Sequence, residues 1–265
     1  MRASFRQLGR PLLPLLLALS VLAACQSPAE RAQAHYKRGM ELLAAGDTDR
    51  ALVEFRNVFV LDGTNVPARL AYAKAVRDRG DTRDAMGQYL RVADQDPANV
   101  EAQRAVIEIA IATQDFATAE EHATEAVGLA PRDPVIRALK ATVDYRHPET
   151  RAVAVETARE VVAEAPATLP AQMVLIADRL NAGAPGEALA QADAAMALIP
   201  DDRNLHLVRL AALEASGDTA GSGEELKRMA ALFPDAPGIT QALVQWYMRA
   251  GDTAGAEATL RAAAD

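Results

Sequence analysis

The sequence predicts an all-α protein, a helical solenoid of about seven helix–turn–helix repeats. The first observation is a small residue that recurs every 34 or 35 residues. It occurs at Ala51, Ala85, Ala119, Ala154, Ala188, Ser222 and Ala256. The second is composition, because apolar residues make up 50% of the chain and aromatic residues only 4%. Strands favour aromatic and β-branched residues, so a core of this kind suits closely stacked helices.

Glycine, aspartate and proline recur with the same period and mark the ends of the predicted helices. Glycines suited to a left-handed turn stand at Gly46, Gly80, Gly183, Gly217 and Gly251. Aspartates that can cap the second helix of each unit are Asp47, Asp81, Asp115, Asp218 and Asp252. Prolines that end the second helix are Pro97, Pro131, Pro166, Pro200 and Pro234. Two departures are expected to matter: Gln114 replaces a turn glycine, and residues 146–150 contain one extra residue that lengthens a turn.

This period and helix–turn–helix form resemble the tetratricopeptide (TPR) repeat. The resemblance implies a right-handed superhelix over residues 32–265. The expected repeats are 32–65, 66–99, 100–133, 134–168, 169–202, 203–236 and 237–265.

The first 24 residues have the pattern of a secretory signal peptide. Residues 1–10 carry three arginines and no acid, and residues 11–24 are apolar but too short to span a bilayer. The single cysteine, Cys25, follows Leu22, Ala23 and Ala24, which resembles the bacterial lipobox. That resemblance implies cleavage before Cys25, acylation with palmitate-type chains, and residues 25–31 as a lipidated tether. A plain signal peptide with a chance cysteine is the alternative.

Charge and sorting signals narrow the location and the partners. The chain has 28 basic and 36 acidic residues, and loss of the three arginines before Cys25 leaves 25 against 36, or −11. Such an acidic chain argues against nucleic-acid binding, which depends on Lys and Arg. Gln26 stands where an aspartate would favour inner-membrane retention. By this resemblance we expect attachment to the outer membrane on its periplasmic side.

No motif in the sequence predicts catalysis, a metal site or a cofactor other than the lipid on Cys25. The four histidines form no H-x-x-x-H pair, and the G-x-S-x-G and phosphate-loop spacings are absent. Paired carboxylates such as Glu120–Glu121 are typical of solvated helix faces. The sequence therefore indicates a binding protein and not an enzyme.

The TPR resemblance implies that the first helix of each repeat lines a partner-binding groove. The groove positions are Tyr36, Met40, Leu70, Lys74, Arg77, Arg104, Glu108, Ile111 and Tyr145. Basic side chains there suit carboxylates of a peptide, and Tyr36 and Met40 offer apolar contacts. The alternative is that the arginines pair with Asp78 and Glu108, and that Tyr36 packs against the neighbouring repeat.

These features predict a lipid-anchored periplasmic adaptor that binds protein or peptide partners. The resemblance extends to TPR lipoproteins of pilus assembly, secretion, exopolysaccharide export and outer-membrane biogenesis. Two alternatives stay open: a self-assembling structural module and a regulatory subunit of an envelope enzyme. Self-association would use the C-terminal repeat, where Trp246 is either exposed to a partner or packed within its own repeat.

Overall fold

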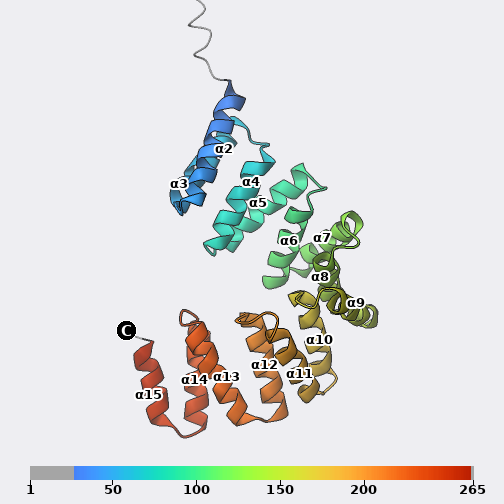
Figure 1. Ribbon diagram of the computed structural model, residues 1–265, viewed down its shortest axis with the longest axis vertical. Coiled ribbons are helices and arrows are strands. Elements are labelled where there is room, and N and C mark those ends of the chain that lie inside the picture. The colour runs from blue at the N-terminus through green and yellow to red at the C-terminus, as the bar shows by residue number, and fades with distance from the viewer. Residues whose placement is uncertain (1–26, 264–265) are drawn as a thin grey trace, which may run out of the picture. The chain divides into compact units, whose positions relative to one another are not determined.

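The computed structural model describes residues 27–263, in which fourteen helices and no strands are found (Figure 1). The signal-peptide residues and Cys25 lie outside the described residues. The helices of the first four pairs are α2 (Pro28–Ala44), α3 (Thr48–Leu61), α4 (Val66–Asp78), α5 (Thr82–Gln95), α6 (Val100–Ala112), α7 (Phe116–Leu129), α8 (Pro134–Asp144) and α9 (Arg151–Glu164). The remaining helices are α10 (Leu169–Asn181), α11 (Pro185–Met196), α12 (Arg203–Ser216), α13 (Thr219–Leu232), α14 (Pro237–Arg249) and α15 (Thr253–Ala262). The predicted all-α solenoid of helix–turn–helix repeats is confirmed.

Two compact units divide the chain, with the boundary between Ala102 and Gln103 inside α6. Unit 1 contains α2 to α5 and the start of α6, and unit 2 contains the rest. No helix within residues 27–263 is long and apolar enough to cross a membrane.

The helix boundaries follow from local capping. The five recurring aspartates accept hydrogen bonds from the backbone N–H three residues later, as Asp81 does from Asp84. This satisfies one of the N–H groups left free at a helix start. The first helix begins at Pro28, before the predicted start of the first repeat at residue 32. The reason is a capping box, in which Ser27 and Glu30 each bond the other's backbone N–H.

The turns between the two helices of a pair also match their sequence signals. The five turn glycines have φ between +70° and +83°, a region that favours glycine. Gln114 adopts the same left-handed turn, with φ of +62°, although it carries a side chain. The extra residue of the fourth repeat lies in the turn between α8 and α9, which runs from Tyr145 to Thr150.

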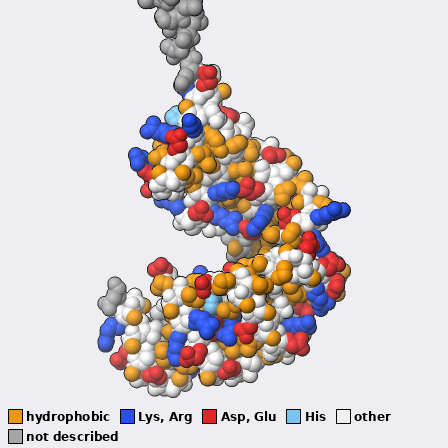
Figure 2. Space-filling view, in the orientation of Figure 1, with side chains coloured by type: hydrophobic (Ala, Val, Ile, Leu, Met, Phe, Trp, Pro, Cys, Tyr) orange, Lys and Arg blue, Asp and Glu red, His pale blue; other side chains and the backbone are white. Residues whose placement is uncertain are grey.

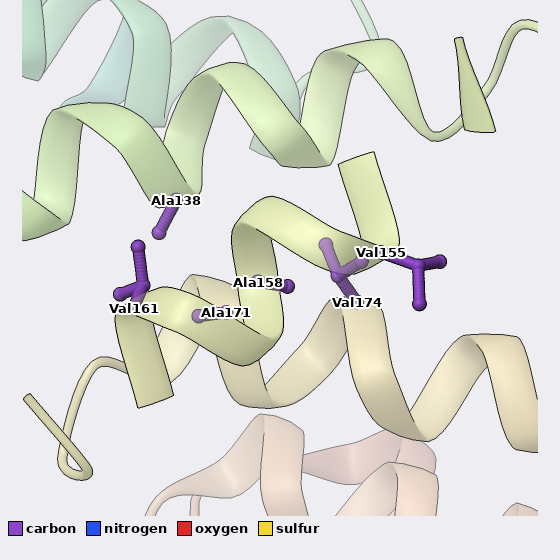
Figure 3. Close-up of a cluster of buried hydrophobic side chains, with 6 residues drawn as sticks. All are labelled: Ala138, Val155, Ala158, Val161, Ala171 and Val174. Atoms are coloured by element: carbon purple, nitrogen blue, oxygen red, sulfur yellow. The ribbon is translucent and has the colours of Figure 1, made fainter. Parts of the chain in front are cut away.

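The core repeats along each unit. The recurring small residue, from Ala51 to Ala256, is buried in every pair. Figure 3 shows the packing around α9, where Val155, Ala158 and Val161 lie between Ala138 of α8 and Ala171 and Val174 of α10. Small side chains at these positions let neighbouring helices approach closely.

Candidate partner-binding surface

Five of the predicted groove residues lie on the first helices of unit 1, and we call them the unit 1 face. Tyr36 and Met40 come from α2, and Leu70, Lys74 and Arg77 from α4. These two helices contact each other directly. Met40 and Lys74 occupy equivalent positions 34 residues apart, and both side chains are exposed. The unit 1 face therefore places an apolar group beside a cation.

Tyr36 is partly buried and has a structural role. Its ring lies 6.2 Å from that of Phe55 on α3, within the same helix pair. The sequence left open packing against the neighbouring repeat, and the printed contact is with its own second helix. Gly39 makes room for this arrangement, because a Cβ there would stand 2.6 Å from Cε1 of Phe55. Tyr36 therefore offers a partner an edge of its ring and not a whole side chain.

Lys74 forms an ion pair with Glu101 at the start of α6. The hydrogen bond to Glu101 raises the pKa of Lys74, so its ammonium group is charged at neutral pH. Both side chains are about half exposed, at 57% and 49%. An exposed pair contributes roughly 0–1 kcal/mol, so a carboxylate of a partner can replace Glu101 at little cost.

Arg77 lies one turn further along α4 and is exposed. Its side chain hydrogen-bonds Tyr89, while burial raises the pKa of the Tyr89 hydroxyl. Tyr89 is therefore a neutral phenol, and the guanidinium of Arg77 keeps its charge. Lys74 and Arg77 together give the unit 1 face a basic end.

The other four predicted residues lie in unit 2 and are more occupied by their own chain. Arg104 donates from Nε to Glu108 at 2.7 Å, which is the pairing that the sequence left open. Ile111 is partly buried on the same helix. The Tyr145 hydroxyl accepts a hydrogen bond from Asn181 at 2.8 Å, and Arg151 lies over its ring.

A recurring polar pair between the two helices of a repeat was missed by the sequence reasoning. One residue on the first helix meets a residue 19 positions later on the second. The pairs are His35–Glu54, Arg69–Gln88, Gln103–His122, Gln172–Gln191 and His206–Glu225. The available signal was a polar residue recurring every 34 or 35 positions on an otherwise apolar helix face. A buried polar group that loses its partner is costly, so these pairs favour one register of the two helices.

The most buried pair belongs to a charged cluster in unit 2. Glu225 receives contacts from His206 Nδ1 at 2.5 Å and Arg209 Nη1 at 2.6 Å, and Arg209 also reaches Asp193 at 2.6 Å. The side chains of His206 and Glu225 are only 2% and 0% exposed. A substrate has no access to them, so the cluster is structural. Within residues 27–263 no group of three potential metal ligands is found.

Charged side chains of both signs are interspersed on the visible side of each unit (Figure 2). Neither unit shows one dominant charge on that side. Recognition by the unit 1 face therefore rests on particular groups, Lys74 and Arg77, and not on a broad basic field.

Comparison with known proteins identifies the repeat. Residues 42–106 match the tetratricopeptide repeat family model. No curated protein sequence matches the chain. A tetratricopeptide repeat protein from Parabacteroides merdae has a similar structure, with a TM-score of 0.62, 10% identity, and coverage of 89% of this chain and 100% of that chain.

Two further similar structures carry names that refer to pili. PilW, a widely conserved type IV pilus biogenesis factor, matches with a TM-score of 0.59 and 16% identity over 80% of this chain and 98% of its own. PilF of Pseudomonas aeruginosa matches with a TM-score of 0.54 and 14% identity over 82% of this chain and 99% of its own. Identities this low establish the fold alone. The chain therefore has the all-α solenoid fold of tetratricopeptide repeat proteins, and residues 42–106 match that family's sequence model.

Proposed function

We propose that this protein is a lipid-anchored adaptor of the bacterial envelope that binds a protein or peptide partner on the unit 1 face. The observation that carries the proposal is the exposed pairing of Met40 with Lys74 on adjacent first helices, with Arg77 one turn away. A flexible thioether adapts to varied apolar side chains. The two cations suit carboxylates. The partner segment therefore presents an apolar residue next to acidic ones.

The partner works by exchange with an existing ion pair. Glu101 holds Lys74 in the free protein, and both groups are half exposed. A partner carboxylate takes the place of Glu101 and adds contacts with Met40 that the free protein lacks. Binding of this kind weakens as salt concentration rises, because exposed charges are screened.

Assembly of an envelope structure, with a pilus as the first candidate, is the setting that we propose. The support is the fold shared with PilW and PilF. The predicted signal peptide and Cys25 agree with that setting, since they imply export and acylation. The protein's contribution there is binding, with no catalytic step.

The anchor would hold unit 1 close to the outer membrane. Gln26 and Ser27 alone separate Cys25 from the first residue of α2. Three Cα–Cα steps reach about 11 Å at most. The periplasmic side of the outer membrane is the proposed location.

Charge reversal at Lys74 tests the binding face. We expect Lys74→Glu to reduce recovery of the partner in quantitative pull-downs from envelope extracts about tenfold, because an attraction becomes a repulsion. Arg83→Glu is the matched control, since Arg83 is an exposed cation on α5, a second helix of the same unit. Equal recovery with wild type and Lys74→Glu, or equal losses with both variants, would refute the unit 1 face.

Replacement of the cysteine tests the anchor separately. Cys25→Ser removes the only thiol, and we expect the protein to move from the membrane fraction to the soluble periplasmic fraction. Two or more acyl chains are needed for stable attachment. Mass spectrometry of the wild-type N-terminus provides the second readout. Membrane attachment that persists in Cys25→Ser would contradict lipidation as the tether.

A further inference from the structure

An exposed apolar surface lies on the last helix pair, α14 and α15. Leu260 of α15 is 56% exposed, whereas the residue at its position in the other six pairs is at most 2% exposed. Those six residues are Phe55, Tyr89, Ala123, Ala158, Ala192 and Leu226. Ala263 repeats the contrast, because it is exposed and its six counterparts are fully buried. In the earlier pairs these positions are covered by the helix that follows.

The exposed surface is hollowed. A cavity of about 410 Å³ is lined by Pro234, Asp235, Thr240, Val244, Leu260 and Ala263, among others. We call this surface the end face. Its floor comes from α14 and α15, and one wall comes from the loop before α14.

The interior of unit 2 shows what such a surface accepts. Ala192 and Ala195 of α11 hold the positions of Leu260 and Ala263, and α12 packs over them. The α12 residues in this contact are Leu205, Val208 and Ala212, which have the spacing i, i+3 and i+7. α10 packs on α9 in the same manner, through Ala171 and Val174 at i and i+3 (Figure 3). The end face therefore matches a helix with apolar residues at i, i+3 and i+7.

Charge narrows the choice of helix. In the interior contact Arg209 of α12, at position i+4, pairs with Asp193 of α11 at 2.6 Å. Arg261 holds the position of Asp193 on α15, so the charge on the receiving helix is reversed. A docked helix therefore needs Asp or Glu at i+4 to reproduce the ion pair.

We propose that the end face binds an amphipathic helix of a partner protein, with apolar residues at i, i+3 and i+7 and a carboxylate at i+4. This site is separate from the unit 1 face, and the proposal does not depend on it. The argument rests on continuity with the repeated contact inside unit 2 and on the reversed charge at Arg261.

A second copy of this chain does not present such a helix at its first pair. The corresponding residues of α2 are Ala34, Lys37, Arg38 and Glu41. Lys37 and Glu41 are exposed charges at the positions that need apolar groups. Arg38 would face Arg261, and like charges at that distance repel. The occupant is therefore a helix from a different protein.

Peptide binding tests this proposal. The probe is a helix-stapled peptide with the sequence of residues 203–216 and the change Arg209→Glu, and the unchanged peptide is its matched control. A staple is needed because an unconstrained helix of this length is marginal in water. Fluorescence anisotropy with the full chain should show the Glu peptide binding about fivefold to tenfold more tightly than the Arg peptide. Arg261→Glu should reverse that order.

Variants of the end face complete the experiment. Leu260→Asp should abolish binding of both peptides. Because Leu260 is already exposed, circular dichroism should confirm an intact fold. Val60→Asp, on α3, is the control for adding a charge at an exposed apolar site. Equal affinities for the two peptides, no binding, unchanged binding by Leu260→Asp, or a concentration-dependent dimer that Leu260→Asp dissociates would each overturn the proposal.

Discussion

Removal of Glu225 separates a buried charge cluster from an exposed one of the same composition. Glu225, His206 and Arg209 have the same relative spacing as Glu54, His35 and Arg38 in the first pair. Glu54 contacts His35 at 2.5 Å and Arg38 at 3.3 Å. The buried cluster lies inside unit 2, whereas Arg38 is 71% exposed. The two sites differ mainly in burial.

Glu225→Ala should lower the free energy of unfolding of the α12–α13 pair by about 3 kcal/mol. Breaking a buried ion pair from one side costs about 3–5 kcal/mol. The lower end applies because Arg209 keeps Asp193 as a partner. His206 fares worse, since its Nε2 atom already has no hydrogen-bond partner among the described residues and Nδ1 would lose Glu225. Glu54→Ala should cost about 0.5–1 kcal/mol, because water and salt screen an exposed pair.

Hydrogen exchange followed by mass spectrometry measures both variants helix by helix. We expect amides of α12 and α13 to exchange roughly a hundredfold faster in Glu225→Ala, since each 1.4 kcal/mol is a factor of about ten. Amides of α2 and α3 in Glu54→Ala should change by about fivefold or less. Equal effects of the two substitutions would refute the reasoning that burial decides the contribution of this cluster.

Three further predictions concern the turns, the packing of the single tryptophan, and pH. Gln114→Gly should stabilise unit 2 by about 1 kcal/mol by relieving a left-handed non-glycine residue, and Gly80→Ala should destabilise unit 1 by a similar amount; thermal melts showing no difference would contradict this. Gly223→Ala places a Cβ on the indole ring of Trp246 and should cost about 1–3 kcal/mol with a shift in tryptophan emission, whereas Gly87→Ala, with open space around it, should stabilise by about 0.5–1 kcal/mol. The pKa of Asp47 is lowered by its hydrogen bonds to Arg50, so its cap stabilises α3 above pH 4 and is lost as pH falls through the lowered pKa; faster exchange of α3 amides near pH 3, absent in Asp47→Asn, is the expected result.

Much of the fold was predictable because its signals are local. Helix starts depend on residues such as Asp81 and Asp252, which bond N–H groups three residues away. Turns depend on glycines such as Gly46, where a side chain would strain the backbone. The period of 34 then implies that each unit stacks on the next. Even the irregular turn at Gln114 was located correctly, although the backbone there keeps the left-handed form.

Less of the candidate site was predictable, because it depends on groups brought together from different helices. The sequence identified Lys74 as a groove residue but not Glu101 as its partner. It left the pairing of Arg104 open, and the structure shows the bond to Glu108. Trp246 packs neither in the open nor within its own repeat alone: it fills the space above Gly223 of α13 and donates to the Thr219 carbonyl.

The sequence by itself therefore determined the helix pairs, their caps and their order, because each rests on residues a few positions apart. Tertiary structure decided which polar groups meet 19 residues apart and which repeat position stays uncovered. Leu260 illustrates the difference, since it has the same place in the repeat as Leu226 but is 56% exposed instead of 2%. Burial depends on what packs against a side chain, and no property of the repeat itself specifies that. The end face became visible only when the neighbours of each repeat were known.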